Sequence, residues 1–392
     1  MTPVLRPRAV FTPTLIAAAV AGLVCASALP RAVAQSAWTS APPYADMARA
    51  DWFNAANWSA GVPGAGTAVT VNLVPGTVVG IVSGPASAAS VDASNGTLMV
   101  VEGAGRLDTG LFNLGSSDGR DVQTLLRIGS GGIVNAARFV SQGGGGTENT
   151  VSLSGAGSAL NVAGELQIGR SGTGMMQLDE GARVSAGTLQ IGQAGTADGH
   201  VLVIGETPVD ALVAQRIVLA TPDSTLEISR AGTAPLVLGA AISGPGRFEV
   251  SSPVTLTGDN TQSGDIVLGS TLRVGDGANA GSITGNLSGF GRVVFDRGPG
   301  RVAYDGAIGG SIAIDKENAG TLALGGAHDT DGRTRVLGGT LLVNGALPRS
   351  TVEVAGGATL GGLGRSGRPP CARAARWRPA TAAWAPSPCS AT

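Results

Sequence analysis

Two stretches of the chain decide its fold: GELQIG at residues 164–169 and GTLQIG at residues 187–192, which lie 23 residues apart. Each is followed by a Gly-Thr pair, and LRIG at 126–129 is a looser third copy. Short apolar runs between glycine corners, repeating every 20 to 25 residues, are typical of a β-solenoid, in which each coil packs on the next. We therefore predict an all-β chain whose residues 69–364 form a right-handed parallel β-helix, a single elongated rod.

The composition agrees with this prediction and excludes several classes of protein. Of the 392 residues, 63 are Gly and only 14% are charged, against roughly 25% charged residues in an ordinary domain. Residues 35–364 hold 18 basic and 27 acidic side chains, a net charge of −9. Such a mildly acidic body is a poor nucleic-acid binder, and we expect no nucleic-acid partner.

Residues 1–34 have the pattern of an export signal. Arg6 and Arg8 precede an uncharged stretch from Ala9 to Pro30, and the run AVA at 32–34 is a small-x-small cleavage site. We predict cleavage between Ala34 and Gln35. A membrane anchor is the alternative, but an alanine-rich centre and two prolines make the stretch a poor bilayer span. The cysteines lie at 25, 371 and 389, so no disulfide framework is expected in the body.

A second kind of repeat begins in the C-terminal half. The stretches LTGDNTQSG (256–264) and LGSTLRV (268–274) are echoed by LGG (324–326) and LGGTLLV (337–343). This pattern resembles the passenger-associated transport repeat of autotransporters. Further matches are DWFN (51–54), ISGPG (242–246) and LSGFG (287–291), so the resemblance covers about residues 35–364. The second repeat departs from the first, because it carries His328-Asp329 in place of Asn260-Thr261.

The resemblance implies a secreted β-helical passenger and, in intact relatives, a C-terminal outer-membrane β-barrel. We expect five segments, namely a signal peptide (1–34), an aromatic N-terminal cap (35–68), a β-helix with 23-residue repeats (69–241), a β-helix with transport-type repeats (242–364) and a disordered tail (365–392). The tail has five Arg, five Pro and no Leu, Val or Ile, and we interpret it as a shifted reading frame that replaces the barrel. The intact family is placed at the cell surface or outer membrane, and a chain truncated in this way is expected to stay in the periplasm.

The sequence offers few candidate catalytic or metal-binding residues. His328, Asp329 and Asp331 form a weak candidate metal or acid/base cluster, because an imidazole and two carboxylates could converge from one loop. Solvated turn residues are the stronger interpretation. Asp296, Asp305 and Asp315 recur about every ten residues and could form a carboxylate row. We predict no catalytic residue, no cofactor and no resident metal.

Trp38, Trp52 and Trp58 precede the first coils. They either cap the open end of the rod, which terminal coils require, or offer a sugar-stacking surface. The predicted function is that of a non-catalytic adhesin or surface-interaction protein, a monomer whose partners are the export machinery and a glycan or matrix protein. The alternatives are a β-helical polysaccharide-degrading enzyme and a structural export module without a ligand. Three or more carboxylates with a nearby Arg on one exposed face would favour the enzyme.

Overall fold

The computed structural model describes residues 33–39, 50–72, 78–116, 123–143, 148–193, 198–279, 281–366 and 376–377. The described residues from Val33 onward belong to one unit. The predicted signal peptide therefore lies outside the described residues, apart from Val33 and Ala34. The three cysteines lie outside them as well.

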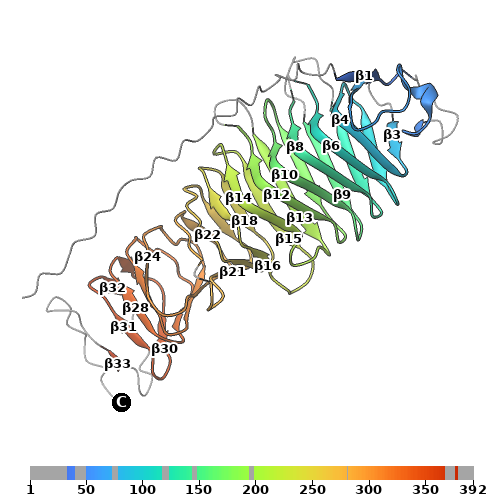
Figure 1. The fold of residues 1–392 in the computed structure, drawn as a ribbon. Coiled ribbons are helices and arrows are strands. Elements are labelled where there is room, and N and C mark those ends of the chain that lie inside the picture. The colour runs from blue at the N-terminus through green and yellow to red at the C-terminus, as the bar shows by residue number, and fades with distance from the viewer. Residues whose placement is uncertain are drawn as a thin grey trace, which may run out of the picture. The chain divides into compact units, whose positions relative to one another are not determined.

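Parallel strands stacked in coils make up the described unit (Figure 1). Sheet 1 has nine strands in the order β1 (Ala34–Ala37), β2 (Thr67–Asn72), β4 (Pro85–Ser94), β6 (Arg106–Leu114), β8 (Ile133–Ser141), β10 (Ala159–Ile168), β12 (Arg183–Ile191), β14 (Leu212–Leu219) and β17 (Ala241–Ser243). Sheet 2 has ten, in the order β3 (Val78–Val82), β5 (Leu98–Glu102), β7 (Leu125–Gly129), β9 (Asn149–Ser154), β11 (Gly174–Leu178), β13 (Gly199–Gly205), β15 (Thr225–Arg230), β18 (Arg247–Val250), β20 (Ile266–Leu268) and β22 (Leu287–Gly289).

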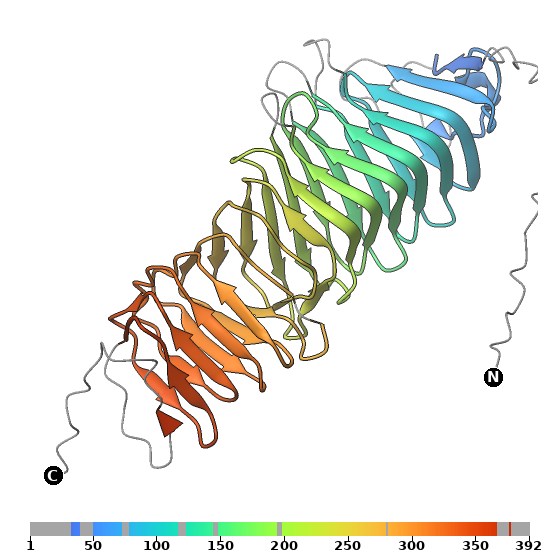
Figure 2. The same ribbon diagram turned by 60° about the vertical axis from the view of Figure 1, so that its left-hand side comes forward.

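Three further sheets continue the stack toward the C-terminus (Figure 2). Sheet 3 contains β16 (Leu236–Leu238), β19 (Val254–Leu256), β21 (Thr271–Val274), β23 (Arg292–Asp296), β25 (Ala313–Glu317), β27 (Thr334–Val336) and β30 (Val352–Val354). Sheet 4 contains β24 (Arg301–Tyr304), β26 (Thr321–Leu324), β28 (Thr340–Val343), β31 (Thr359–Gly361) and β33 (Arg376–Trp377), and sheet 5 pairs β29 (Ala346–Leu347) with β32 (Arg365–Ser366). Within the described ranges, the one helical element is the 3-10 turn Ala55–Asn57. The prediction of a parallel β-solenoid is confirmed.

The 23-residue repeat places equivalent residues of neighbouring coils side by side, in register. β10 and β12 pair so that Leu166 lies beside Leu189, Gln167 beside Gln190 and Ile168 beside Ile191. Identical side chains thus repeat at the spacing between neighbouring strands, about 4.8 Å. The looser third copy, 126–129, was placed wrongly: it lies in β7 of sheet 2, and the true equivalent of Leu166 in the preceding coil is Phe139.

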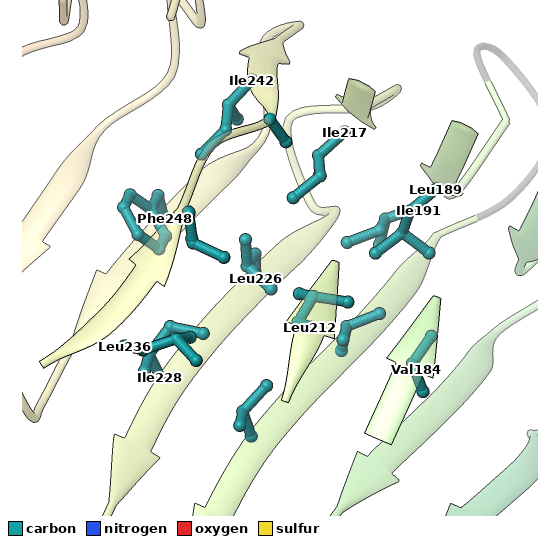
Figure 3. Close-up of a cluster of buried hydrophobic side chains, with 14 of the residues drawn as sticks. Val184, Leu189, Ile191, Leu212, Ile217, Leu226, Ile228, Leu236, Ile242 and Phe248 are labelled. Carbon is teal, nitrogen blue, oxygen red and sulfur yellow. The ribbon is translucent and has the colours of Figure 1, made fainter. Parts of the chain in front are cut away.

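The core is a set of aliphatic columns inside the coils. Alternate residues of each strand point inward, as in β9, whose burial alternates over all six residues. Leu189, Ile217 and Ile242 follow one another in register and are fully buried. Figure 3 shows this part of the core, formed by Val184, Leu189, Ile191, Leu212, Ile217, Leu226, Ile228, Leu236, Ile242 and Phe248. Burial of each such side chain stabilises the fold by about 1.5–3 kcal/mol, and it is available only when the neighbouring coil is present.

The stretches GPGR (244–247) and GFGR (289–292) form the same kind of corner. The first glycine of each is in the left-handed region, with φ of +102° at Gly244 and +114° at Gly289. At the second glycine, a Cβ would lie 2.5 Å from the Ser224 carbonyl oxygen at Gly246 and 2.1 Å from that of Ser270 at Gly291. Only glycine fits both positions, which explains why these stretches recur.

The two predicted β-helix segments meet where the sheets change. Sheet 1 ends at β17 and sheet 3 begins at β16, close to the predicted boundary at residue 242, while sheet 2 runs across it without a break. In the predicted tail, 365–366 and 376–377 lie in the short strands β32 and β33. The other residues of 367–392 lie outside the described residues. The structure therefore does not test the interpretation of this tail as a shifted reading frame.

Candidate functional site

The predicted cluster of His328, Asp329 and Asp331 does not converge. His328 points into the core and is 1% exposed. Asp329 and Asp331 point outward and lie 3.3 and 3.9 Å from the guanidinium of Arg349. The weak metal candidate fails because successive residues of an extended chain point to opposite sides.

His328 occupies an interior column otherwise filled by apolar residues. It pairs with Ile308 in the preceding coil, and its ring stacks on Tyr304 with centroids 6.2 Å apart. Neither ring nitrogen has a hydrogen-bond partner among the described residues. Burial lowers the pKa of His328 to about 4, with a small opposing effect of Asp305. The imidazole is therefore a neutral core side chain at neutral pH.

The predicted carboxylate row is only partly formed. Asp296 and Asp315 both lie on sheet 3, at 6% and 2% exposure, whereas Asp305 is exposed in the turn after β24. The row on sheet 3 instead contains arginines: Arg273, Val294, Asp315, Arg335 and Glu353 follow one another in register. Opposite charges lie beside one another on successive strands, an arrangement that stabilises a sheet.

We call seven charged side chains of sheet 3 the charged face: Arg273, Arg292, Asp296, Asp315, Glu317, Arg335 and Glu353. The eighth, Lys316, belongs to the inner column. Arg335 donates to both oxygens of Asp315, with Nε 2.7 Å from Oδ1, and Arg292 lies 3.5 Å from the same carboxylate. Arg273 reaches across the Val294 coil and donates from Nη1 to Asp296 and, at 2.8 Å, to Glu317. These contacts neutralise the buried carboxylates.

The arginines of the charged face are held in their ionised form. The hydrogen bond to Asp315 raises the pKa of Arg335 against the effect of burial. Burial acts to lower the pKa of Arg273, but Glu317 and Asp296 outweigh it and raise the pKa. Both guanidiniums therefore stay charged at every physiological pH.

Lys316 is a buried charged residue whose place in the core the sequence pattern did not predict. It is the single lysine of the chain and lies at 2% exposure in the inner column between Phe295 and Val336. Its Nζ donates to the backbone carbonyls of Glu317, Asn318 and Gly338. Burial lowers the pKa of Lys316, and Asp296 and Glu317 oppose this effect. The ammonium closes the corner of its coil.

The three N-terminal tryptophans form one buried cluster. Trp38, Trp52 and Trp58 are 4%, 0% and 5% exposed, and the ring of Trp58 meets the other two edge to face at 4.9 and 4.7 Å. The indole of Trp58 donates to the Trp52 carbonyl oxygen at 2.7 Å. The rings are covered, so they do not offer a sugar-stacking surface, and they lie beside β1, the first strand of sheet 1.

The described residues contain neither a metal-binding cluster nor a membrane-spanning helix. Across them, no group of three or more His, Cys, Asp or Glu side chains is placed to hold a metal ion. In the same part of the chain, no helix has the length and apolar character needed to cross a bilayer.

Comparison with known proteins adds one match. Residues 314–343 match the family model of the passenger-associated-transport-repeat. The match spans β25 to β28 and includes Asp315, Lys316, Glu317 and Arg335. No curated protein and no solved structure matches the chain. The repeat match and the parallel β-solenoid together fit the passenger of an autotransporter.

Proposed function

We propose that the protein is an exported autotransporter passenger that binds a surface ligand without catalysing a reaction. The transport repeat at 314–343 supports export. The stacked coils support ligand binding, because they present rows of outward side chains at regular spacing on a rigid frame. Such a frame suits an adhesin that holds its binding surface away from the cell.

The arginine–carboxylate pairs of the charged face are the observation that disfavours catalysis. Four carboxylates gather with arginines on sheet 3, but Asp296 and Asp315 are buried and bound by guanidinium groups. A carboxylate that acts as acid, base or nucleophile must reach its substrate. The arrangement therefore favours a structural role for these residues over polysaccharide cleavage.

Substitution of Asp315 separates the two roles. We expect Asp315→Ala to lower the free energy of unfolding by about 2 kcal/mol, because it leaves Arg335 and Arg292 beside a buried site without their partner. The matched control Glu353→Ala, at the more exposed end of the same row, should cost less than about 1 kcal/mol. Urea denaturation measures both values. A stability gain in Asp315→Ala would instead be typical of a strained catalytic residue.

The match also supports a second candidate function, a module that assists folding during export. If residues 242–364 fold first, they should be the most stable part of the chain. We expect limited proteolysis to leave this segment intact longest, with the cut fragments identified by mass spectrometry. Survival of the N-terminal coils after loss of 242–364 would contradict the prediction.

Export by a cleaved signal is part of the proposal. Ala34 and Gln35 open β1 and lie beside Thr67 and Ala68 of β2. Cleavage between Ala34 and Gln35 would leave the rest of β1 as the first strand of the solenoid. N-terminal sequencing of the exported protein should begin at Gln35.

The direct test of function has two arms. The purified protein is applied to arrays of glycans and of matrix proteins, and it is incubated with polysaccharides while new reducing ends are measured. Binding without release of reducing ends is the expected result. Release of reducing ends would replace the proposal with the polysaccharide-degrading alternative.

A further inference from the structure

A hollow of about 450 Å³ opens at one corner of the middle coils. It is lined by Ala156, Gly157, Ser158, Ala159, Gly181, Arg183, Glu206, Thr207 and Pro208. We call Arg183 and the turn residues Glu206, Thr207 and Pro208 its wall. The turn between β13 and β14 supplies the last three, because it has six residues where the two preceding turns of this corner have four. The volume lies within the range of small-ligand sites.

Two arginines, Arg230 on the inside and Arg183 on the outside, fix the position of the longer turn. Arg230 is buried and donates from Nε to the Thr207 hydroxyl at 2.8 Å, from Nη2 to the Thr207 carbonyl and from Nη1 to the Ala234 carbonyl. On the outside, Arg183 lies 3.0 Å from Asp210. The wall is therefore a fixed surface rather than a loose loop, and a ligand would not have to order it.

The hollow continues into a row of polar side chains on sheet 1. Ser185 and Asn161 lie two residues beyond Arg183 and Ala159, hence on the same outer side of their strands. Ser185 donates to Asn161 at 2.9 Å, Asn161 to Asn135 at 2.9 Å, and Asn135 to Asp108 at 2.7 Å. We call these four residues the amide row; with strands about 4.8 Å apart it is about 15 Å long.

The chemistry of this surface favours a neutral polyhydroxyl ligand. Arg183 is balanced by Asp210, and Arg106 binds Asp108 with Nε 3.0 Å from the carboxylate, so both arginines of this surface are neutralised by a carboxylate. Half-exposed amides can both donate to and accept from hydroxyl groups. Glu206 is exposed and has no hydrogen bond or ion pair within the described part of the chain, which leaves its carboxylate open to accept from a ligand. The glycine and alanine residues of the lining carry no polar side-chain group, which suits the apolar face of a sugar ring.

We infer that the hollow and the amide row bind a chain of neutral sugars, with one ring seated against Glu206 and Arg183 and the following rings along the amide row. This inference rests on the proposed function and names the ligand class for it. A polyanion would be repelled by the carboxylates of Glu206 and Asp108, and a single small molecule would not contact the amide row. A linear glycan matches both the hollow and the extended row.

The test measures binding of the purified protein to immobilised neutral glucans, mannans, galactans and xylans, with matrix proteins on the same surface. We expect binding to at least one neutral glycan, weakened about tenfold or more by Glu206→Ala and by Arg183→Ala. Both residues are exposed, so their substitution should leave the fold intact. Arg247→Ala is the matched control, because Arg247 is an exposed arginine that lies 2.8 Å from Glu249 on sheet 2.

The outcomes distinguish this inference from the proposed function. Glycan binding that both wall variants leave unchanged, or binding to matrix proteins alone, would overturn the hollow as the site and leave the surface-binding function standing. No binding to any glycan or matrix protein would overturn both. Loss of glycan binding in the wall variants and not in Arg247→Ala would support both.

Discussion

The protein should lose stability between pH 6.5 and pH 4 because of one buried histidine, His328. In the unfolded chain this imidazole takes up a proton near pH 6.5, whereas in the folded protein its pKa is about 4. Between these values the unfolded state binds the extra proton, so stability falls as the pH falls through this window and is unaffected by this group above it. At about 1.4 kcal/mol per pH unit, the full loss is about 3 kcal/mol.

His328→Leu tests this expectation, since leucine matches Leu347, the next member of the same column. The measurement is the free energy of unfolding of the variant minus that of the parent, at pH 7 and at pH 4. This difference should be about 3 kcal/mol more favourable to the variant at pH 4 than at pH 7. Ile308→Val, one coil away in the column, is the control, because it alters packing without a titratable group and its effect should be the same at both pH values. A His328→Leu difference that does not change with pH would contradict the assignment of a neutral core histidine.

The second large effect is expected at the N-terminal end of the solenoid. Trp52→Ala should destabilise the first coils by about 3–5 kcal/mol, because it removes a fully buried ring and leaves a cavity beside Trp58. In a stack where each coil contacts only its neighbours, the loss is felt first by β2 and β4. Hydrogen exchange measured by mass spectrometry should show faster exchange in these strands and unchanged exchange in β12 and beyond.

Phe53→Ala is the matched control, since Phe53 is the neighbouring aromatic residue and is 40% exposed. It should change stability by about 0.5 kcal/mol or less. Equal effects of the two substitutions would show that the tryptophan cluster is not a cap. Exchange that accelerates evenly along the solenoid would contradict the model of coil-by-coil stability.

The fold can be predicted from the sequence where similar residues repeat at the period of the coil. The copies at 164–169 and 187–192 superimpose because strand register places equal residues side by side, and Leu166 meets Leu189 for that reason. The corners at GPGR and GFGR were also readable, because only glycine adopts their backbone conformation without a clash. The looser copy at 126–129 misled because period-2 apolar patterns look alike in every sheet of a solenoid.

Spacing along the sequence does not predict which side of a strand a residue faces. Asp296, Asp305 and Asp315 are evenly spaced in sequence, yet two lie buried on sheet 3 and one is exposed in a turn. His328 and its acidic neighbours were grouped because they are adjacent, whereas an extended chain sends them to opposite sides. The pairing of Arg335 with Asp315 joins residues 20 apart, a distance that is meaningful only once the coil length at that point is known.

The sequence by itself determined that this chain is a glycine-cornered stack of strands, because period, turn chemistry and apolar alternation are local properties. Only the tertiary structure decided that the carboxylates of sheet 3 are bound by arginines, that Lys316 and His328 lie inside the coils, and that a six-residue turn builds a hollow beside the amide row. Each of these depends on the offset between neighbouring coils of unequal length. That offset is set by packing across the whole stack rather than by any one stretch of residues.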